Sequence, residues 1–202
     1  MRTILGVCLL VVSLIVSAQD KISLLQEGDL LFCLSGEENI ITQVTEGIGG
    51  SKVDHVGIVH LQNDSVYVLE AIHRGVVLTP VDTFLVRRDS LVMAARLRNP
   101  QGVEQSVRRA LAYLGRPYDF LFMPDDSELY CSELVQKCYL NADGSEIFPA
   151  IPMSFHDKTG TVTQYWKNYY ARRGKDVPEG ESGSNPGDLS RSGKIKFLFR
   201  FY

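Results

Sequence analysis

Three residues of the chain have the side chains that nucleophilic catalysis by a thiol requires: Cys131, His55 and Glu70. Attack by a cysteine needs the thiolate, a base that exchanges its proton, and a polar group that orients the base. His55 and Glu70 both fall within residues 53–72, VDHVGIVHLQNDSVYVLEAI, whereas Cys131 falls within residues 129–140, LYCSELVQKCYL. The chemistry is therefore possible only if the fold brings these two stretches together.

The alternating pattern of residues 53–72 predicts a β-hairpin with its turn at 62–65, where Asn and Asp favour turn positions. In the register that this turn favours, the numbers of paired residues sum to 127. His55 and Glu70 then share one face as diagonal neighbours, about 5–8 Å apart at Cβ. Gly57 faces Glu70 in the same register and leaves room for the carboxylate.

A carboxylate on an apolar strand face needs a partner, and an imidazole beside it is a natural one. The carboxylate can fix the tautomer of the histidine and stabilise the imidazolium. The same pattern also fits a purely structural His–Glu pair, or a hairpin in which a bulge breaks the register. The hairpin alone therefore leaves a catalytic and a structural interpretation open.

Residues 127–140 predict a helix with Cys131 at or near its start, capped by Asp125, Asp126 or Ser127. Backbone N–H groups at a helix start favour the thiolate over the thiol. A lone cysteine in a helix is more often a small buried hydrophobe than a nucleophile. Its combination with a His–Glu pair favours the catalytic interpretation.

The first eighteen residues, MRTILGVCLLVVSLIVSA, predict a secretory signal peptide that is cleaved after Ala18. Arg2 precedes an apolar run that ends in the small residues Ser17 and Ala18, and this run is short for a membrane span. An uncleaved anchor is the alternative. We expect residues 19–202 to be a single exported domain, periplasmic or extracellular, without stable membrane insertion.

The composition is typical of a globular protein and does not suggest a nucleic-acid partner. The chain is 45% hydrophobic and 22% charged with a net charge of −3, whereas a nucleic-acid binder usually shows a basic patch. Removal of the signal peptide takes Cys8 away and leaves three of the four cysteines. At least one thiol is then free or paired between chains. Cys33 and Cys138 form either a disulfide or two buried thiols.

The rest of the chain predicts short strands and a few helices. Strands or a strand and a turn are expected at 28–34, 76–85, 91–98 and 194–202, helices at 40–48 and 100–118, and a long loop at 174–193. The aromatic residues of 165–170 fit either the core or the wall of a cleft. The histidines, acids and cysteines lack zinc-type spacing, so we predict no metal.

Five motifs occur in the order GDLLF, DHVGIV, VLEA, LGRPYDF and YCSELV. Together they resemble the circularly permuted papain-like amidases of the YiiX/YaeF-like group, relatives of the NlpC-type cell-wall hydrolases. The resemblance covers residues 25–155. It implies an α+β fold in which an antiparallel sheet packs against the helix that carries the nucleophile, with the histidine moved ahead of the cysteine.

The resemblance also assigns roles to individual residues. It makes Cys131 the nucleophile, His55 the general base and Glu70 the group that orients the base. Tyr118 in LGRPYDF and Tyr130 in YCSELV are then expected to contact the substrate. The resemblance implies no cofactor.

We therefore expect an exported cysteine hydrolase, an amidase or peptidase, that cleaves an amide bond through an acyl-enzyme. Its substrate would be a small peptide or amide, with a peptidoglycan fragment as one candidate. Two alternatives remain: a lipid-directed thiol acyltransferase or thioesterase on the same fold, and a non-catalytic binding module. A long apolar groove would favour lipid, and a short polar cleft would favour peptide.

Overall fold

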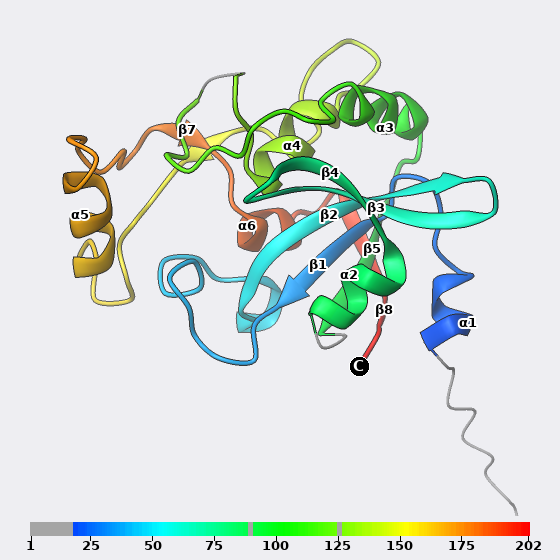
Figure 1. The fold of residues 1–202 in the computed structure, drawn as a ribbon, viewed down its shortest axis with the longest axis horizontal. Coiled ribbons are helices and arrows are strands. Elements are labelled where there is room, and N and C mark those ends of the chain that lie inside the picture. Colours follow the sequence, from blue (N-terminus) through cyan, green and yellow to red (C-terminus); the bar gives the residue numbers. More distant parts are fainter. Residues whose placement is uncertain (1–17, 89–90, 125–126) are drawn as a thin grey trace, which may run out of the picture.

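The computed structural model describes residues 18–88, 91–124 and 127–202, so most of the predicted signal peptide lies outside the described residues. A six-stranded antiparallel sheet with the strand order β4-β3-β2-β1-β5-β8 forms the centre (Figure 1). Its strands are β1 (Leu30–Leu34), β2 (Val53–Gln62), β3 (Ser65–Ile72), β4 (Gly75–Pro80), β5 (Val92–Leu97) and β8 (Ile195–Arg200). The remaining elements are α1 (Ala18–Ile22), η1 (Ile48–Gly50), α2 (Val81–Arg87), α3 (Val103–Leu111), α4 (Cys131–Cys138), β6 (Ile151–Pro152), α5 (Gln164–Ala171), β7 (Ser182–Gly183) and α6 (Pro186–Ser190).

Two apolar clusters cover opposite faces of the sheet, because successive strand residues point to opposite sides. In β1, Leu30 and Phe32 belong to the cluster that packs against α3 and α4. Leu31 and Cys33 belong to the cluster that packs against α1 and α2. Figure 1 shows α3 and α4 above the sheet and α2 below it, with α5 standing apart. The sheet thus lies between two helical layers, and the predicted α+β class is confirmed.

The predicted hairpin of β2 and β3 is present in the predicted register. Each pair of the ladder sums to 127, as Ile58 and Leu69 do at its inner end. Asn63 and Asp64 have φ angles of 48° and 59°, the positive values that tight two-residue hairpin turns require. Beyond this ladder β3 continues along β4, where Glu70 pairs with Val77.

Two stretches between the strands differ from the prediction. The expected helix at 40–48 is a hydrogen-bonded turn followed by η1; Asn39 caps this turn by accepting the backbone N–H groups of Ile41 and Thr42, but the turn does not continue into a helix. Residues 81–87, expected as strand or turn, form α2. The buried side chains of this helix are spaced i, i+3, i+4, at Val81, Phe84 and Leu85.

The expected loop at 174–193 contains β7 and α6. Asn185 caps α6 by accepting the backbone N–H of Asp188 at 2.8 Å, and Pro186 follows it at the first helical position. The final strand β8 is confirmed, but a bulge opposite Ala94 and Ala95 breaks its predicted one-sided alternation. This C-terminal segment therefore contributes side chains to both faces of the sheet.

All three cysteines of the described part are free thiols. Cys33 lies on the α2 side of the sheet and Cys138 on the α4 side, so the sheet separates them. The alternative of a disulfide between them is therefore wrong. Within the described ranges, no helix has the length and apolar character that a membrane span needs.

Candidate active site

The hairpin places His55 and Glu70 in direct contact. His55 Nε2 lies 2.7 Å from Glu70 Oε2, and both side chains are buried. Gly57 stands between them on β2, where a Cβ atom would lie only 2.4 Å from the side chain of Val68. A residue without a side chain is therefore needed at this position, and the two functional side chains meet across it.

Glu70 has two further partners that the sequence did not reveal. Thr79 Oγ1 donates a hydrogen bond to Glu70 Oε1 at 2.7 Å, and Arg87 Nη2 lies 2.7 Å from each carboxylate oxygen. Burial raises the pKa of Glu70, but the hydrogen bonds and charge of His55, with Arg87 and Thr79, lower it to about 2. The carboxylate is therefore ionised at every physiological pH.

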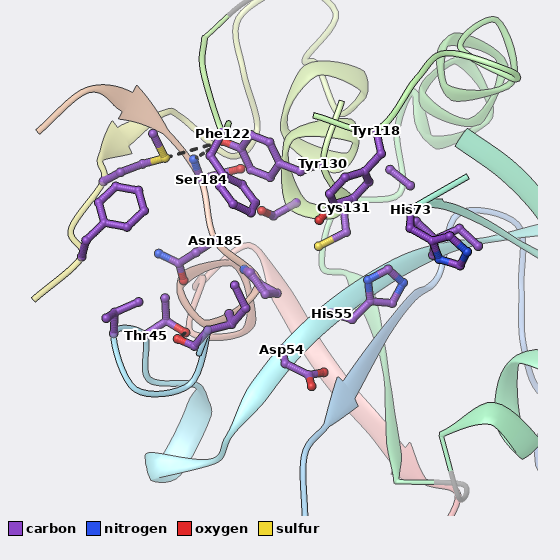
Figure 2. A pocket seen from close by; sticks show the side chains of 18 of the residues that line it. Thr45, Asp54, His55, His73, Tyr118, Phe122, Tyr130, Cys131, Ser184 and Asn185 are labelled. Atoms are coloured by element: carbon purple, nitrogen blue, oxygen red, sulfur yellow. Dashed lines mark hydrogen bonds between the residues drawn. The ribbon is translucent and has the colours of Figure 1, made fainter. Parts of the chain in front are cut away.

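Cys131 is the first residue of α4, and its side chain lies beside the imidazole of His55, with which it interacts (Figure 2). Burial lowers the pKa of His55, but the charge and hydrogen bond of the Cys131 thiolate, with those of Glu70, raise it to about 9. Because Glu70 occupies Nε2, Nδ1 is the ring nitrogen left to exchange a proton with the thiol. The three residues singled out from the sequence thus meet at one place.

The start of α4 is capped differently from the prediction. Tyr130 is the N-cap residue and its side chain makes no capping bond, so Ser127 is not the cap, while Asp125 and Asp126 lie outside the described residues. Glu133, at the third helical position, accepts the backbone N–H of Tyr130, which is half of a capping box. Burial raises the pKa of Glu133 to about 8, although Lys137 lowers it. Glu133 thereby fixes the turn that carries the thiol.

The three residues come from opposite sides of the sheet. Arg87 of α2 binds Glu70, and Phe84 of α2 lies against His55 with ring centroids 6.2 Å apart. Cys131 comes from α4, which packs against the other face. They meet where β2 begins and β3 ends, so this end of the two strands brings the thiol and the imidazole together between the two layers.

A pocket of about 460 Å³ opens over Cys131 and His55. One part of its lining is charged and consists of Asp54, Arg87 and Arg88. The other part is largely aromatic and consists of Tyr118, Phe122, Tyr130, Met153, Phe155 and Trp166. The close-up in Figure 2 shows Phe122 and Tyr130 on one side of Cys131 and His55 on the other. A substrate at the thiol would contact both kinds of wall.

The two tyrosines expected to contact substrate both line this pocket. Burial and the negative charge of Cys131 raise the pKa of Tyr118, so its hydroxyl keeps its proton near neutral pH. The Tyr130 hydroxyl accepts the backbone N–H of Ser184 at 3.0 Å and contacts Met153 Sδ at 3.9 Å. Tyr130 therefore fastens the 182–185 segment to the helix start, whereas Tyr118 has no such anchoring role.

The remaining candidates divide between pocket and surface. His73 lines the pocket, whereas His60 and His156 pair elsewhere with Glu27 and Glu179 at 2.9 and 3.0 Å. Of the α5 aromatics, Trp166 is buried and also lines the pocket, so the core and cleft interpretations are both correct for it. Across residues 18–88, 91–124 and 127–202, no group of three or more His, Cys, Asp or Glu residues is arranged to hold a metal.

Comparison with known proteins agrees with this geometry. Residues 24–199 match the family described as permuted papain-like amidase enzyme, YaeF/YiiX, C92 family. The chain is 30% identical over 184 residues to the uncharacterized protein YiiX of Escherichia coli K12, covering 88% of each chain. It also matches a crystal structure described as the metalloprotein YiiX of Escherichia coli O157:H7, with a TM-score of 0.71 and 26% identity, over 87% of this chain and 97% of the other. The order of histidine before cysteine, the antiparallel sheet against the thiol-bearing helix and the family match together show that the chain belongs to the permuted papain-like amidases.

Proposed function

We propose that this protein is an exported cysteine amidase or peptidase that cleaves an amide bond in a small peptide or amide, with cell-wall fragments as the candidate substrates. The observation that carries the proposal is that Cys131 and His55 line one pocket while the fully buried Glu70 binds His55 from behind it. A thiol, its base and the orienting carboxylate are the groups that covalent amide cleavage by cysteine requires.

The reaction begins with a proton on His55 and a negative charge on Cys131. The thiolate attacks the carbonyl carbon, and the carbonyl oxygen becomes an oxyanion. Backbone N–H groups at the start of α4 lack helical partners and can donate to this oxyanion, as can the protonated hydroxyl of Tyr118. The imidazolium then gives its proton to the leaving amine, the C–N bond breaks and a thioester to Cys131 remains.

The second half of the reaction releases the acid. Neutral His55 removes a proton from water, the hydroxide attacks the thioester carbonyl, and the C–S bond breaks to regenerate the thiolate. Glu70 stabilises the imidazolium through Nε2 in both halves and holds the ring in one tautomer. Arg87 neutralises part of the carboxylate charge and fixes its position.

All of these steps are assigned to side chains and the backbone. The Escherichia coli relative is described as a metalloprotein. In the described part of this chain, no three His, Cys, Asp or Glu residues are grouped so that they could hold a metal ion. The Glu70 carboxylate is already engaged by His55, Thr79 and Arg87. We therefore derive no step that passes through a metal.

Export and the cell-wall substrate rest on features other than the site. The signal-like pattern of residues 1–18 supports export, and the likeness to amidases supports an amide substrate. The charged part of the pocket suits a peptide, whereas its aromatic part suits an apolar acyl group. A lipid-directed thioesterase or acyltransferase would use the same acyl-thioester and is the second candidate.

The proposal is tested on the purified protein without residues 1–18. Iodoacetamide should alkylate Cys131 first, because Cys33 and Cys138 are fully buried. The protein is incubated with purified wall fragments and the products are measured by mass spectrometry. Alkylation of Cys131 should abolish the release of these products. Cys131→Ala should fold and be inactive, and Cys138→Ser should keep its activity. Wild-type turnover by Cys131→Ala would refute the mechanism.

A matched substrate pair separates the two candidate functions. The same acyl group is offered as an amide and as a thioester, with hydrolysis and transfer to an added amine both measured. Cleavage of the amide supports the amidase. Cleavage of the thioester alone supports the lipid-directed enzyme, and reaction with neither, despite binding, supports a non-catalytic module.

A further inference from the structure

The aromatic part of the pocket forms a continuous apolar wall beside the thiol. Phe155 and Trp166 contact each other with ring centroids 5.1 Å apart, and Phe122 lies 5.8 Å from Trp166 and 5.3 Å from Tyr130. Met153 completes the wall. Trp166 is 2% exposed, and Phe122 is half-buried with its ring in the lining of the pocket. An apolar surface of this kind is stabilised when a ligand covers it.

Phe122 holds its ring there at a conformational cost. Its φ angle is 53°, a value that bulky residues rarely adopt. The carboxylate of Asp119 accepts the backbone N–H groups of Leu121 and Met123, both at 2.6 Å, and Tyr170 Oη donates to the carbonyl of Leu121 at 3.0 Å. Strained residues held by such over-determined surroundings cluster at ligand sites.

The charged part of the pocket is largely satisfied within the protein. Arg87 binds both oxygens of Glu70, and Asp54 receives Arg88 Nη1 at 3.4 Å and Asn39 Nδ2 at 2.8 Å. These charges are committed to positioning the site. The apolar wall therefore contributes to the discrimination between substrates, together with Ser132 Oγ and Ser184 Oγ of the lining, which have no hydrogen-bond partner among the described residues.

We infer that this wall, made by Phe122, Met153, Phe155 and Trp166, is a specificity subsite for an apolar side chain, aromatic or branched aliphatic, that the substrate carries next to the scissile carbonyl. The inference rests on the proposed amide cleavage for its orientation, because Phe122 packs on Tyr130, the residue before Cys131, in the same pocket. Phe122 is its specificity-determining residue. Its ring is the part of the wall that the strained backbone presents to the pocket.

The binding test needs no turnover, because Trp166 is the only tryptophan of the chain and lies in the wall. Cys131→Ala is titrated with N-acetyl-phenylalaninamide and N-acetyl-alaninamide while tryptophan fluorescence is recorded. Burial of a phenyl group predicts binding about 10- to 100-fold tighter for the phenylalanine probe. Equal affinity for the two probes would overturn the inference.

Phe122→Gly in the same background separates a subsite from a structural ring. Glycine adopts positive φ freely, which offsets part of the packing that the ring loses, so the variant should still fold while the preference falls to about threefold or less. Asp64→Gly is the matched control, because it places glycine at a φ of 59° in the distant hairpin turn and should keep the full preference. Phe122→Leu, which keeps an apolar side chain, should retain an intermediate preference.

Two outcomes for these variants contradict the inference. One is an undiminished preference in Phe122→Gly. The other is a large fall in the melting temperature of Phe122→Gly together with an unchanged preference in Phe122→Leu. Failure of the proposed function looks different. Selective binding by Cys131→Ala together with no hydrolysis of any amide by the wild type would leave the subsite in place and remove the amidase.

Discussion

At the residue scale, His55 lies between two negative groups, Glu70 at Nε2 and the Cys131 thiolate at the other side of the ring. Both hold a proton on the imidazole and raise its pKa to about 9 despite the opposing effect of burial. The ion pair needs that proton, so kcat/KM should fall as the pH rises through about 9. Glu70→Gln removes one of the two charges and should move this alkaline limb to lower pH in a pH–rate profile.

The acidic side of the same profile provides a control. Glu70 has a pKa of about 2, so its protonation contributes no limb between pH 4 and 8. An alkaline limb that stays in place in Glu70→Gln would show that the carboxylate does not act on the imidazole.

The three residues should also differ in the size of their effects. His55→Ala should lower kcat by about 100-fold or more, because positioned proton transfer typically contributes 10²–10⁴-fold. Glu70→Gln should cost less, since the amide still accepts the imidazole N–H. A larger defect in Glu70→Gln than in His55→Ala, measured on the same substrate, would mean that their roles are exchanged.

The sequence was sufficient for these three residues and insufficient for their partners. His55 and Glu70 could be paired because a two-residue turn and period-two alternation define a register. Thr79 and Arg87 reach Glu70 from β4 and α2, and their positions depend on how those elements pack. No short-range pattern encodes the packing of α2, whereas Thr79 lies in a two-residue hairpin of β3 and β4 whose register was a usable signal.

At the element scale, α2 places Arg87 against the buried carboxylate of Glu70. Arg87→Met leaves Glu70 charged with less compensation, so unfolding in urea should show a loss of about 2–3 kcal/mol. Loss of one partner of a fully buried pair typically costs 3–5 kcal/mol, and Arg87 is 36% exposed. Arg108→Met is the control, because its pair with Glu104 is exposed and worth at most about 0.5 kcal/mol.

A double variant checks the cause of that loss. Glu70→Gln together with Arg87→Met removes the buried charge as well as its partner, so it should recover much of the stability lost in Arg87→Met. Strictly additive losses would indicate that the arginine stabilises α2 by packing rather than by its charge.

The first turn of α4 depends on Glu133, whose pKa burial raises to about 8. An acid with a raised folded pKa destabilises the fold progressively as the pH rises from its unfolded value, near 4.5, through its folded value. Glu133→Gln keeps the acceptor for the Tyr130 N–H and cannot ionise. Its melting temperature relative to the wild type should therefore increase between pH 5 and 8, and a difference that is flat with pH would contradict this.

Most elements with strong periodicity were predicted, with the exception of residues 40–48, which form only a turn and η1, and elements set by a few local contacts were not. The β2–β3 hairpin, α3 and β8 follow clear patterns. The helix α2 was missed because a strand-like run, GVVLTP, leads directly into it, although the spacing of Val81, Phe84 and Leu85 was a usable signal. The helix α6 was missed although Asn185-Pro186 is a recognised helix start.

At the scale of the whole molecule, the sheet keeps the two structural thiols apart. Burial raises the pKa of Cys138 to about 12 and that of Cys33 still higher, so neither is a ready nucleophile. The intact mass of the protein without residues 1–18 should not change on reduction, and a thiol reagent should count three thiols after denaturation. A gain of two hydrogens on reduction would contradict the observed separation.

The division of the site between the two layers makes catalysis an all-or-none property of the finished domain. If only α4 has packed on the sheet, Cys131 is in place but Arg87 does not anchor Glu70 beside His55. If only α2 has packed, His55 and Glu70 are in place but Cys131 is not. Heat inactivation should therefore superimpose on the cooperative unfolding transition rather than precede it. Under the proposed function, an incompletely folded chain would have no hydrolytic activity towards the molecules around it.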